Sequence, residues 1–171
     1  MCDGLTLFYY NSRFATNMDK KLSYEYIRGL IEGEGCFTFN TNTSKVASGL
    51  VVKKKIPTFA LAMNVRDLEL LGLFKSSLKL RNKIYKFRPR FLKDGYKRGG
   101  MAMILVRDMG QLKNIIVPLC YKGLSGYKGI QFVAWMDEIG KNSNVPESFK
   151  FIHKIYINGF YDRKDNFEKY E

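Results

Sequence analysis

The chain has 171 residues, and its 29 Lys and Arg against 16 Asp and Glu give a formal net charge of +13. Its 46% hydrophobic and 15% aromatic content exclude a disordered chain and favour one globular domain. Three cysteines without a Cys-x-x-Cys pair, and a single histidine, exclude a disulfide scaffold and a Cys/His zinc site. No apolar run approaches the roughly 20 residues of a membrane helix, so we expect an intracellular protein without a membrane partner.

The positive charge is concentrated in the middle third of the chain. Residues 45–98 contain 15 basic and 3 acidic side chains, and so carry +12 of the total charge of +13. Aromatic residues are interleaved with these cations. Such a block attracts polyanions, and its binding is sensitive to salt because counterions are released. Nucleic acid is the expected partner, and a basic face that serves only solubility is the alternative.

Hydrophobic periodicity predicts the elements of the first half. Residues 1–22 show no period and are expected to form an N-terminal extension. Ser23 is a candidate N-cap for a helix that ends near residues 33–35, and an alternating strand follows over residues 36–40. A second alternating strand covers residues 50–62.

The second half repeats the order helix, strand, strand. Asp67 is a candidate cap for a helix to about residue 80, and strands over 83–88 and 101–106 form a predicted hairpin. Asp108 begins a further helix that we expect Pro118 to end. Two more helices and a charged tail follow, at residues 130–139, 149–156 and 162–171. The pattern predicts an α+β domain over residues 23–161, in which helices cover one face of an antiparallel sheet.

The uncovered face of this sheet is expected to be polar and basic. A strand ribbon fits the major groove of B-form DNA, where side chains reach base edges while flanking cations hold phosphates. The residues that the alternation assigns to this face are Thr38, Asn40, Lys54, Thr58, Lys86 and Arg88.

The first predicted helix contains an unusual set of glycines and acids. Gly29 and Gly33 lie four residues apart on one face, and each costs about 0.5–1 kcal/mol relative to alanine. Small residues at this spacing allow two helix backbones to approach closely, so we infer a helix-to-helix contact. Glu32 and Glu34 lie at the C-terminal end, where the helix dipole disfavours carboxylates. They are either solvated acids after a helix terminus or ligands of a divalent metal such as Mg²⁺.

The stretch from Tyr26 to Phe37, Tyr-Ile-Arg-Gly-Leu-Ile-Glu-Gly-Glu-Gly-Cys-Phe, resembles the LAGLIDADG motif of homing endonucleases. Residues 57–61 resemble the second-strand segment of that family, and residues 124–129 with Gln131 and Phe132 resemble the region of its catalytic lysine. The resemblance extends over about residues 22–161. It implies the LAGLIDADG fold, αββαββα with a concave antiparallel DNA-binding sheet. One motif implies a homodimer whose motif helices pack on Gly29 and Gly33.

The resemblance also implies roles for individual residues. Glu34 takes the position of the essential metal ligand, helped by the carbonyl of Gly33, whereas Glu32 takes the less directly catalytic acidic position. Lys128 matches the basic residue that polarises water or steadies the phosphate. The implied cofactor is Mg²⁺, with Mn²⁺ or Ca²⁺ as other occupants. Asn64 stands near the place where several relatives have glutamine. The implied DNA-facing positions are Cys36, Thr38, Asn40, Asn42, Lys54, Ile56, Thr58, Ala60, Lys86 and Arg88.

The function implied by the resemblance is sequence-specific cleavage of double-stranded DNA in intron homing. A magnesium-dependent homodimer would hydrolyse one phosphodiester in each strand of a long, nearly palindromic target. A DNA- or RNA-binding protein on the same fold is the alternative: an intron maturase that binds its host intron RNA, or a transcription regulator, without cleavage. A generic RNA-binding module is the third class. The expected location is a bacterial cytoplasm or an organelle, either a mitochondrion or a chloroplast.

Overall fold

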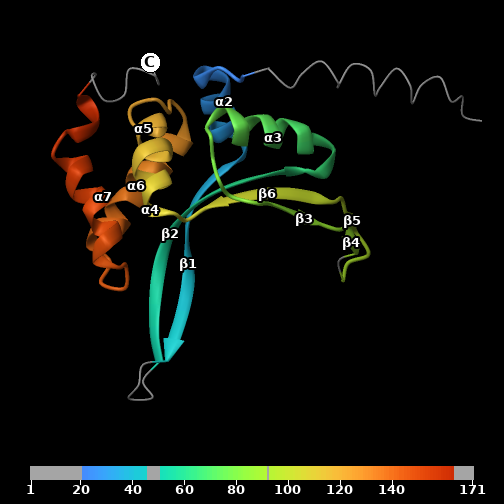
Figure 1. Ribbon diagram of the computed structural model, residues 1–171. Helices are drawn as coiled ribbons and strands as arrows, with labels where there is room; N and C mark the ends of the chain where they lie inside the picture. The colour runs from blue at the N-terminus through green and yellow to red at the C-terminus, as the bar shows by residue number, and fades with distance from the viewer. Residues whose placement is uncertain (1–20, 46–50, 92, 164–171) are drawn as a thin grey trace, which may run out of the picture.

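The computed structural model describes residues 21–45, 51–91 and 93–163 (Figure 1). The expected extension over residues 1–22 and tail over 162–171 therefore lie almost entirely outside the described residues. Four antiparallel strands form a sheet in the order β1-β2-β6-β3, and a separate ribbon consists of β4 and β5. Helices pack on one face of the larger sheet, which confirms the predicted α+β class. None of the described helices is long and apolar enough to cross a membrane.

Most elements begin and end close to their predicted positions, except that β1 continues to Lys45 instead of ending at residue 40, and that β4 and β5 replace an expected turn. In chain order the elements are α2 (Tyr24–Glu34), β1 (Gly35–Lys45), β2 (Val51–Asn64), a 3₁₀ turn (Val65–Asp67), α3 (Leu68–Ser77), β3 (Ile84–Phe87), β4 (Arg90–Phe91), β5 (Lys97–Arg98), β6 (Met101–Val106), α4 (Met109–Gln111), a π-helical turn (Leu112–Ile116), α5 (Val117–Cys120), α6 (Tyr127–Lys141), α7 (Glu147–Ile157) and a final 3₁₀ turn (Phe160–Asp162).

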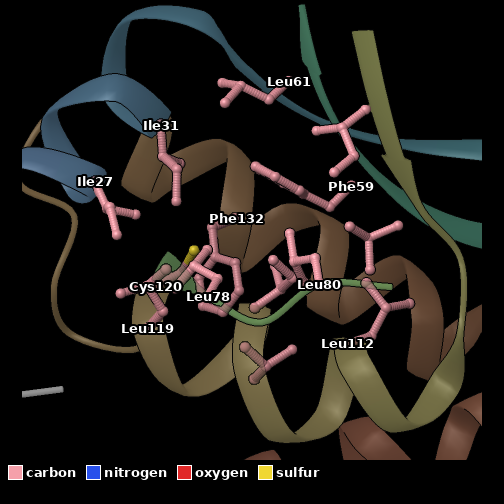
Figure 2. Close-up of a cluster of buried hydrophobic side chains, with 14 of the residues drawn as sticks. Ile27, Ile31, Phe59, Leu61, Leu78, Leu80, Leu112, Leu119, Cys120 and Phe132 are labelled. Carbon is pink, nitrogen blue, oxygen red and sulfur yellow. The ribbon is translucent and has the colours of Figure 1, made fainter. Parts of the chain in front are cut away.

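The hydrophobic core lies between the sheet and its helices. Phe59 and Leu61 of β2 are fully buried and face Ile27 and Ile31 of α2, as Figure 2 shows. On β6 the alternate residues Ala102, Ile104 and Val106 are fully buried on the same side. Strand residues alternate between faces, so this burial identifies the helix-covered face and leaves an opposite, open face.

The β1–β2 hairpin extends well beyond the rest of the sheet (Figure 1). The pairing of β1 with β2 runs from Gly35↔Leu61 to Lys45↔Val51, whereas β6 pairs only with residues 59–64 of β2. The hairpin is anchored on α6, because Trp135 Nε1 donates a hydrogen bond of 2.9 Å to the carbonyl oxygen of Thr38. The distal part of the hairpin is therefore a two-stranded arm.

One predicted cap and one predicted helix end differ from the structure. Asp67 takes the N-cap position of α3, but its side chain makes no capping hydrogen bond; Asn64 caps the preceding 3₁₀ turn, because its Oδ1 accepts from the backbone N–H of Arg66 at 3.0 Å. Pro118 does not end its helix, which continues through α5 to Cys120. The π-helical turn before α5 changes the local hydrogen bonding, and proline lies in the first turn of α5, where the missing N–H is tolerated. The predicted caps Ser23 and Asp108 are confirmed.

Candidate functional site

The C-terminal end of α2 passes directly into β1. A Cβ atom on Gly35 would lie 2.6 Å from the carbonyl oxygen of Ile31, so only glycine permits this close turn of the chain. Glu34 is consequently held at the junction of helix and strand, where its side chain is exposed. The carboxylate of Glu34 has no hydrogen-bond or ion-pair partner among the residues that the structure describes. It is available for a ligand.

Glu34 lines a hollow of about 420 Å³ together with residues from the end of β2 and the start of β6. Asn64 borders this hollow, and its Nδ2 lies 3.1 Å from the position that a Cβ on Gly99 would take. Tyr96 is a further lining residue that the sequence reasoning missed. The only signal for Tyr96 was its place among the aromatic residues of the basic block. The hollow therefore presents one carboxylate, one amide and one phenol.

Glu32 points to a different part of the chain from Glu34. Its Oε1 accepts hydrogen bonds from the backbone N–H groups of Ser125, at 2.6 Å, and Gly126, at 2.9 Å. These two groups immediately precede α6, so Glu32 fixes the start of α6 against α2. Lys128 lies in the first turn of α6 and is half-buried. Lys128 does not line the hollow that contains Glu34, but Glu32 ties their two helices together.

The glycine face of α2 is open in the described chain. Gly29 and Gly33 are exposed, and a Cβ on either would meet no atom within 4 Å. Arg28 does not cover them, because its Nε donates to the carbonyl oxygen of Leu119 at 3.1 Å and its guanidinium packs on Gly123. The long side chain is thus bound to α5 and the following loop. The glycine face is left accessible to a second helix.

Most predicted DNA-facing residues of the arm lie on the open face of the sheet. The register pairs Cys36↔Ala60, Thr38↔Thr58, Asn40↔Ile56 and Asn42↔Lys54, all on the side opposite the buried Phe59. Cys36, Asn42 and Lys54 are exposed, and Thr38, Asn40 and Ile56 are half-buried.

Thr58 and Ala60 do not present accessible side chains. Thr58 is 0% exposed, and its hydroxyl donates to the carbonyl oxygen of Ile56 at 3.0 Å. Ala60 is also buried. Both are short side chains on a central strand. Arg107, which follows β6, reaches Asn40 of β1: with the Asn40 amide turned so that its oxygen faces the guanidinium, both terminal nitrogens donate to this oxygen at 3.1 Å. Arg107 must therefore cross β2 near Thr58, and the expectation that Thr58 and Ala60 contact a ligand is corrected.

The predicted face of β3 is wrong by one residue. Lys86 pairs with the fully buried Ala102, so it lies on the helix-covered side of the sheet although its side chain is exposed at the edge. Arg88 lies after the end of β3 and is exposed. The residues of β3 on the open face are Tyr85 and Phe87. The alternation in the sequence predicted that the cations lie on the open face, because aromatic residues usually face a core.

The donor set at the end of α2 fits a divalent cation only with additional oxygen ligands. The described residues contain no group of three His, Cys, Asp or Glu side chains that could hold a metal ion. Glu34 supplies one free carboxylate, and Glu32 is occupied by backbone N–H groups. Mg²⁺ characteristically takes one or two carboxylates and completes its shell with water and phosphate oxygens. The site therefore fits Mg²⁺ in the presence of a phosphate-bearing ligand.

Comparison with known proteins gives both a family and a fold. The sequence profile of the LAGLIDADG endonucleases matches residues 27–139. A search of curated proteins finds no significant match. The structure is similar to that of the I-LtrWI LAGLIDADG homing endonuclease bound to target DNA, with 26% identity, a TM-score of 0.52 and coverage of 78% of this chain. The chain spans only 41% of the length of that protein.

Two further solved structures share the fold at lower identity. The homing endonuclease I-TnaI has 18% identity and a TM-score of 0.50, over 88% of this chain and 84% of its own. The group I intron-encoded homing endonuclease I-CeuI, solved in complex with DNA, has 15% identity and a TM-score of 0.51, over 95% and 70%. Since the family profile covers more than half of the sequence, and the motif helix lies at the sheet as described, the chain belongs to the LAGLIDADG endonuclease family.

Proposed function

We propose that this chain is a sequence-specific homing endonuclease that acts as a homodimer and hydrolyses one phosphodiester in each strand of duplex DNA with Mg²⁺. The observation that carries the proposal is the free carboxylate of Glu34, held at the junction of α2 and β1 in a hollow at the end of the open sheet face. A phosphodiester on this face supplies the oxygen ligands that the protein lacks. The relatives solved with DNA support the same ligand.

Glu34 and the carbonyl of Gly33 would hold the metal, and Lys128 would approach the phosphate from α6. Bound Mg²⁺ supplies Lewis-acid stabilisation of a phosphate oxygen and lowers the pKa of water. Glu34, fixed at the helix end, would place the metal beside the reacting phosphate. The Lys128 ammonium offsets negative charge on the phosphate, and Glu32 positions Lys128 by holding Ser125 and Gly126. Because the Glu32 carboxylate accepts hydrogen bonds from backbone N–H groups, its role is to position the start of α6.

The homodimer is proposed from the open glycine face of α2. A second copy of α2 can approach Gly29 and Gly33 closely, because no described residue has an atom within 4 Å of a Cβ placed on either glycine. Two-fold symmetry then places one Glu34 near each strand of a duplex and predicts a nearly palindromic target. Gly33→Leu should give a monomer in sedimentation velocity while the chain stays folded, because the added side chain points into open space in the single chain. A dimer of unchanged affinity would contradict this interface.

The decisive experiment selects cleaved duplexes from a randomised library with and without Mg²⁺. We expect an enriched, nearly palindromic site that is cut only with a divalent metal. On that site Glu34→Gln should lower the cleavage rate by at least roughly 100-fold while DNA affinity changes little, because the isosteric amide no longer attracts the metal. Unchanged magnesium-dependent cleavage would disprove the assignment of Glu34.

Glu25→Gln is the matched control for the loss of one carboxylate from α2. Glu25 lies exposed in the first turn of the same helix, at the end opposite Glu34. The backbone N–H of Glu25 and the side chain of Ser23 lower the pKa of the Glu25 carboxyl, so this control removes an ionised carboxylate. The control should cleave at the wild-type rate. Selective binding by the wild-type protein without any cleavage would instead indicate a binding protein.

A further inference from the structure

The half of the open face formed by β3 and β6 carries a cluster of large apolar side chains. Tyr85 lies opposite Met103, and Phe87 lies opposite Met101 in the antiparallel register. Tyr85 is 48% exposed, Phe87 44% and Met101 38%, and Met103 is half-buried. We call these four residues the apolar patch. None of the described helices covers it, because they pack on the opposite face of the sheet.

The surroundings of the apolar patch indicate a polyanionic partner. Exposed cations lie before and after β3 and along the β4–β5 ribbon: Lys83, Arg88, Arg90, Lys93 and Lys97. If the apolar patch bound an apolar protein surface, these cations would lie beside it without opposite charges. In a complex with DNA, the phosphates neutralise the cations. Met101 also lines the hollow that contains Glu34, so the apolar patch adjoins the proposed cleavage site.

We propose that the apolar patch reads the C5-methyl groups of thymines in the major groove of the target DNA. This inference rests on the proposed function and names part of its specificity. The thymine methyl is the apolar group that a base pair presents in the major groove, while the other base-edge groups are hydrogen-bond donors and acceptors. Three of the four side chains in the patch offer no strong donor, so they gain little from those polar groups. Their burial against methyl groups is favourable.

The chemistry of the patch also separates DNA from RNA. Uracil lacks the C5-methyl, and the deep, narrow major groove of an A-form helix does not admit side chains from a sheet. Sequence-specific binding of single-stranded RNA needs hydrogen bonds to base edges and 2′-hydroxyls, which Phe87, Met101 and Met103 do not offer. The register of Phe87 with Met101 and of Tyr85 with Met103 provides an apolar surface across two strands instead. The proposal therefore predicts duplex DNA with thymines at fixed positions near the cleavage site.

Deoxyuridine substitution tests the proposal directly, because it removes one methyl group and leaves base pairing intact. Each thymine of the selected target is replaced in turn, and the dissociation constant is measured at one salt concentration without Mg²⁺. We expect a loss of affinity of about fourfold for each methyl that the patch buries, the effect of one buried carbon. Replacing cytosine by 5-methylcytosine in a target with cytosine at the same position should recover part of the affinity.

Variants of the protein connect the methyl effect to the patch. In Phe87→Ser/Met101→Ser the ratio of affinities for thymine and uracil targets should fall to about one at the positions concerned. Both side chains are partly exposed, and circular dichroism verifies that the variant is folded. Ile157→Ser is the matched control, because Ile157 is an exposed apolar residue at the end of α7, outside the sheet. This control should keep the wild-type ratio.

Several results would overturn the proposal. Neutral deoxyuridine substitutions at every position, or a thymine preference that persists in the double variant, would show that the patch does not read methyl groups. Tighter binding to structured RNA than to the selected duplex would assign the face to RNA. A change of oligomeric state in the double variant would assign the patch to a protein interface. Failure to select any duplex refutes the proposed function and this inference together, whereas the other results leave the endonuclease proposal intact.

Discussion

The two halves of the open sheet face differ in chemistry although β2 of one half pairs directly with β6 of the other. The arm formed by β1 and β2 presents Thr38, Asn40, Asn42 and Lys54, which offer hydrogen bonds and charge. The half formed by β3 and β6 presents the apolar patch. Hydrogen-bonding side chains distinguish all four base pairs in the major groove, whereas apolar ones recognise thymine. The difference teaches that one continuous surface can contain two modes of reading.

The largest effect is expected from a substitution in the hydrophobic core that supports both halves of the open face. Phe59 is fully buried on the helix-covered side of β2, and its ring centroid lies 5.6 Å from that of Phe37 and 6.4 Å from that of Phe74. Phe59→Ala should lower the free energy of unfolding by about 3–5 kcal/mol, because it leaves a cavity beneath the central strand. Denaturant unfolding measures this change. A loss below about 1 kcal/mol would show that the two halves do not depend on a common core.

A smaller and more selective effect is expected at the boundary between the halves. Arg107→Ala removes the guanidinium that donates to the amide oxygen of Asn40. We expect roughly tenfold weaker binding of the selected duplex, with relaxed base preference under the arm, because Asn40 is no longer oriented. The thymine-to-uracil affinity ratio at the apolar patch should not change. Arg66→Ala, which removes an exposed arginine from the 3₁₀ turn after β2, is the control for charge alone.

The smallest effect is expected from a comparison of substitutions at two neighbouring lysines of the arm. Lys54 is exposed on the open face, while Lys55 lies on the other side and its Nζ is 3.1 Å from Oε1 of Glu138. Lys54→Ala should reduce the slope of log affinity against log salt by about one, because one phosphate contact is lost. Lys55→Ala should leave the slope unchanged. Equal slopes for both variants would contradict the assignment of the open face.

Much of the fold and of the catalytic end could be predicted from the sequence. Ser23 begins α2 as expected, and the strict alternation in β2 identified Phe59 and Leu61 as core residues. The glycine and acid pattern placed Glu34 at a helix end. These features depend on local geometry, which short sequence patterns encode well.

The errors arose where tertiary contacts decide the outcome. β3 has only four residues, and its face is set by the pairing of Ile84 with Ile104 in β6, which the alternation of β3 alone does not reveal. Thr58 is polar, yet its side chain is fully buried and its hydroxyl donates to the carbonyl oxygen of Ile56. The hydrogen bonds of Glu32 join residues more than 90 positions apart. None of these contacts has a local sequence signal.

The alternation of β2 has a consequence for how this protein evolves. Its odd-numbered residues, such as Phe59, maintain the fold, and its even-numbered residues, such as Lys54, face the open side. A substitution at an exposed even position therefore alters the surface offered to DNA without disturbing the interior. On the proposed function, a descendant lineage would acquire a new DNA target by a few such changes while it inherits the same stability. The two-residue period of a single strand thus separates the residues that maintain the fold from those that are free to vary.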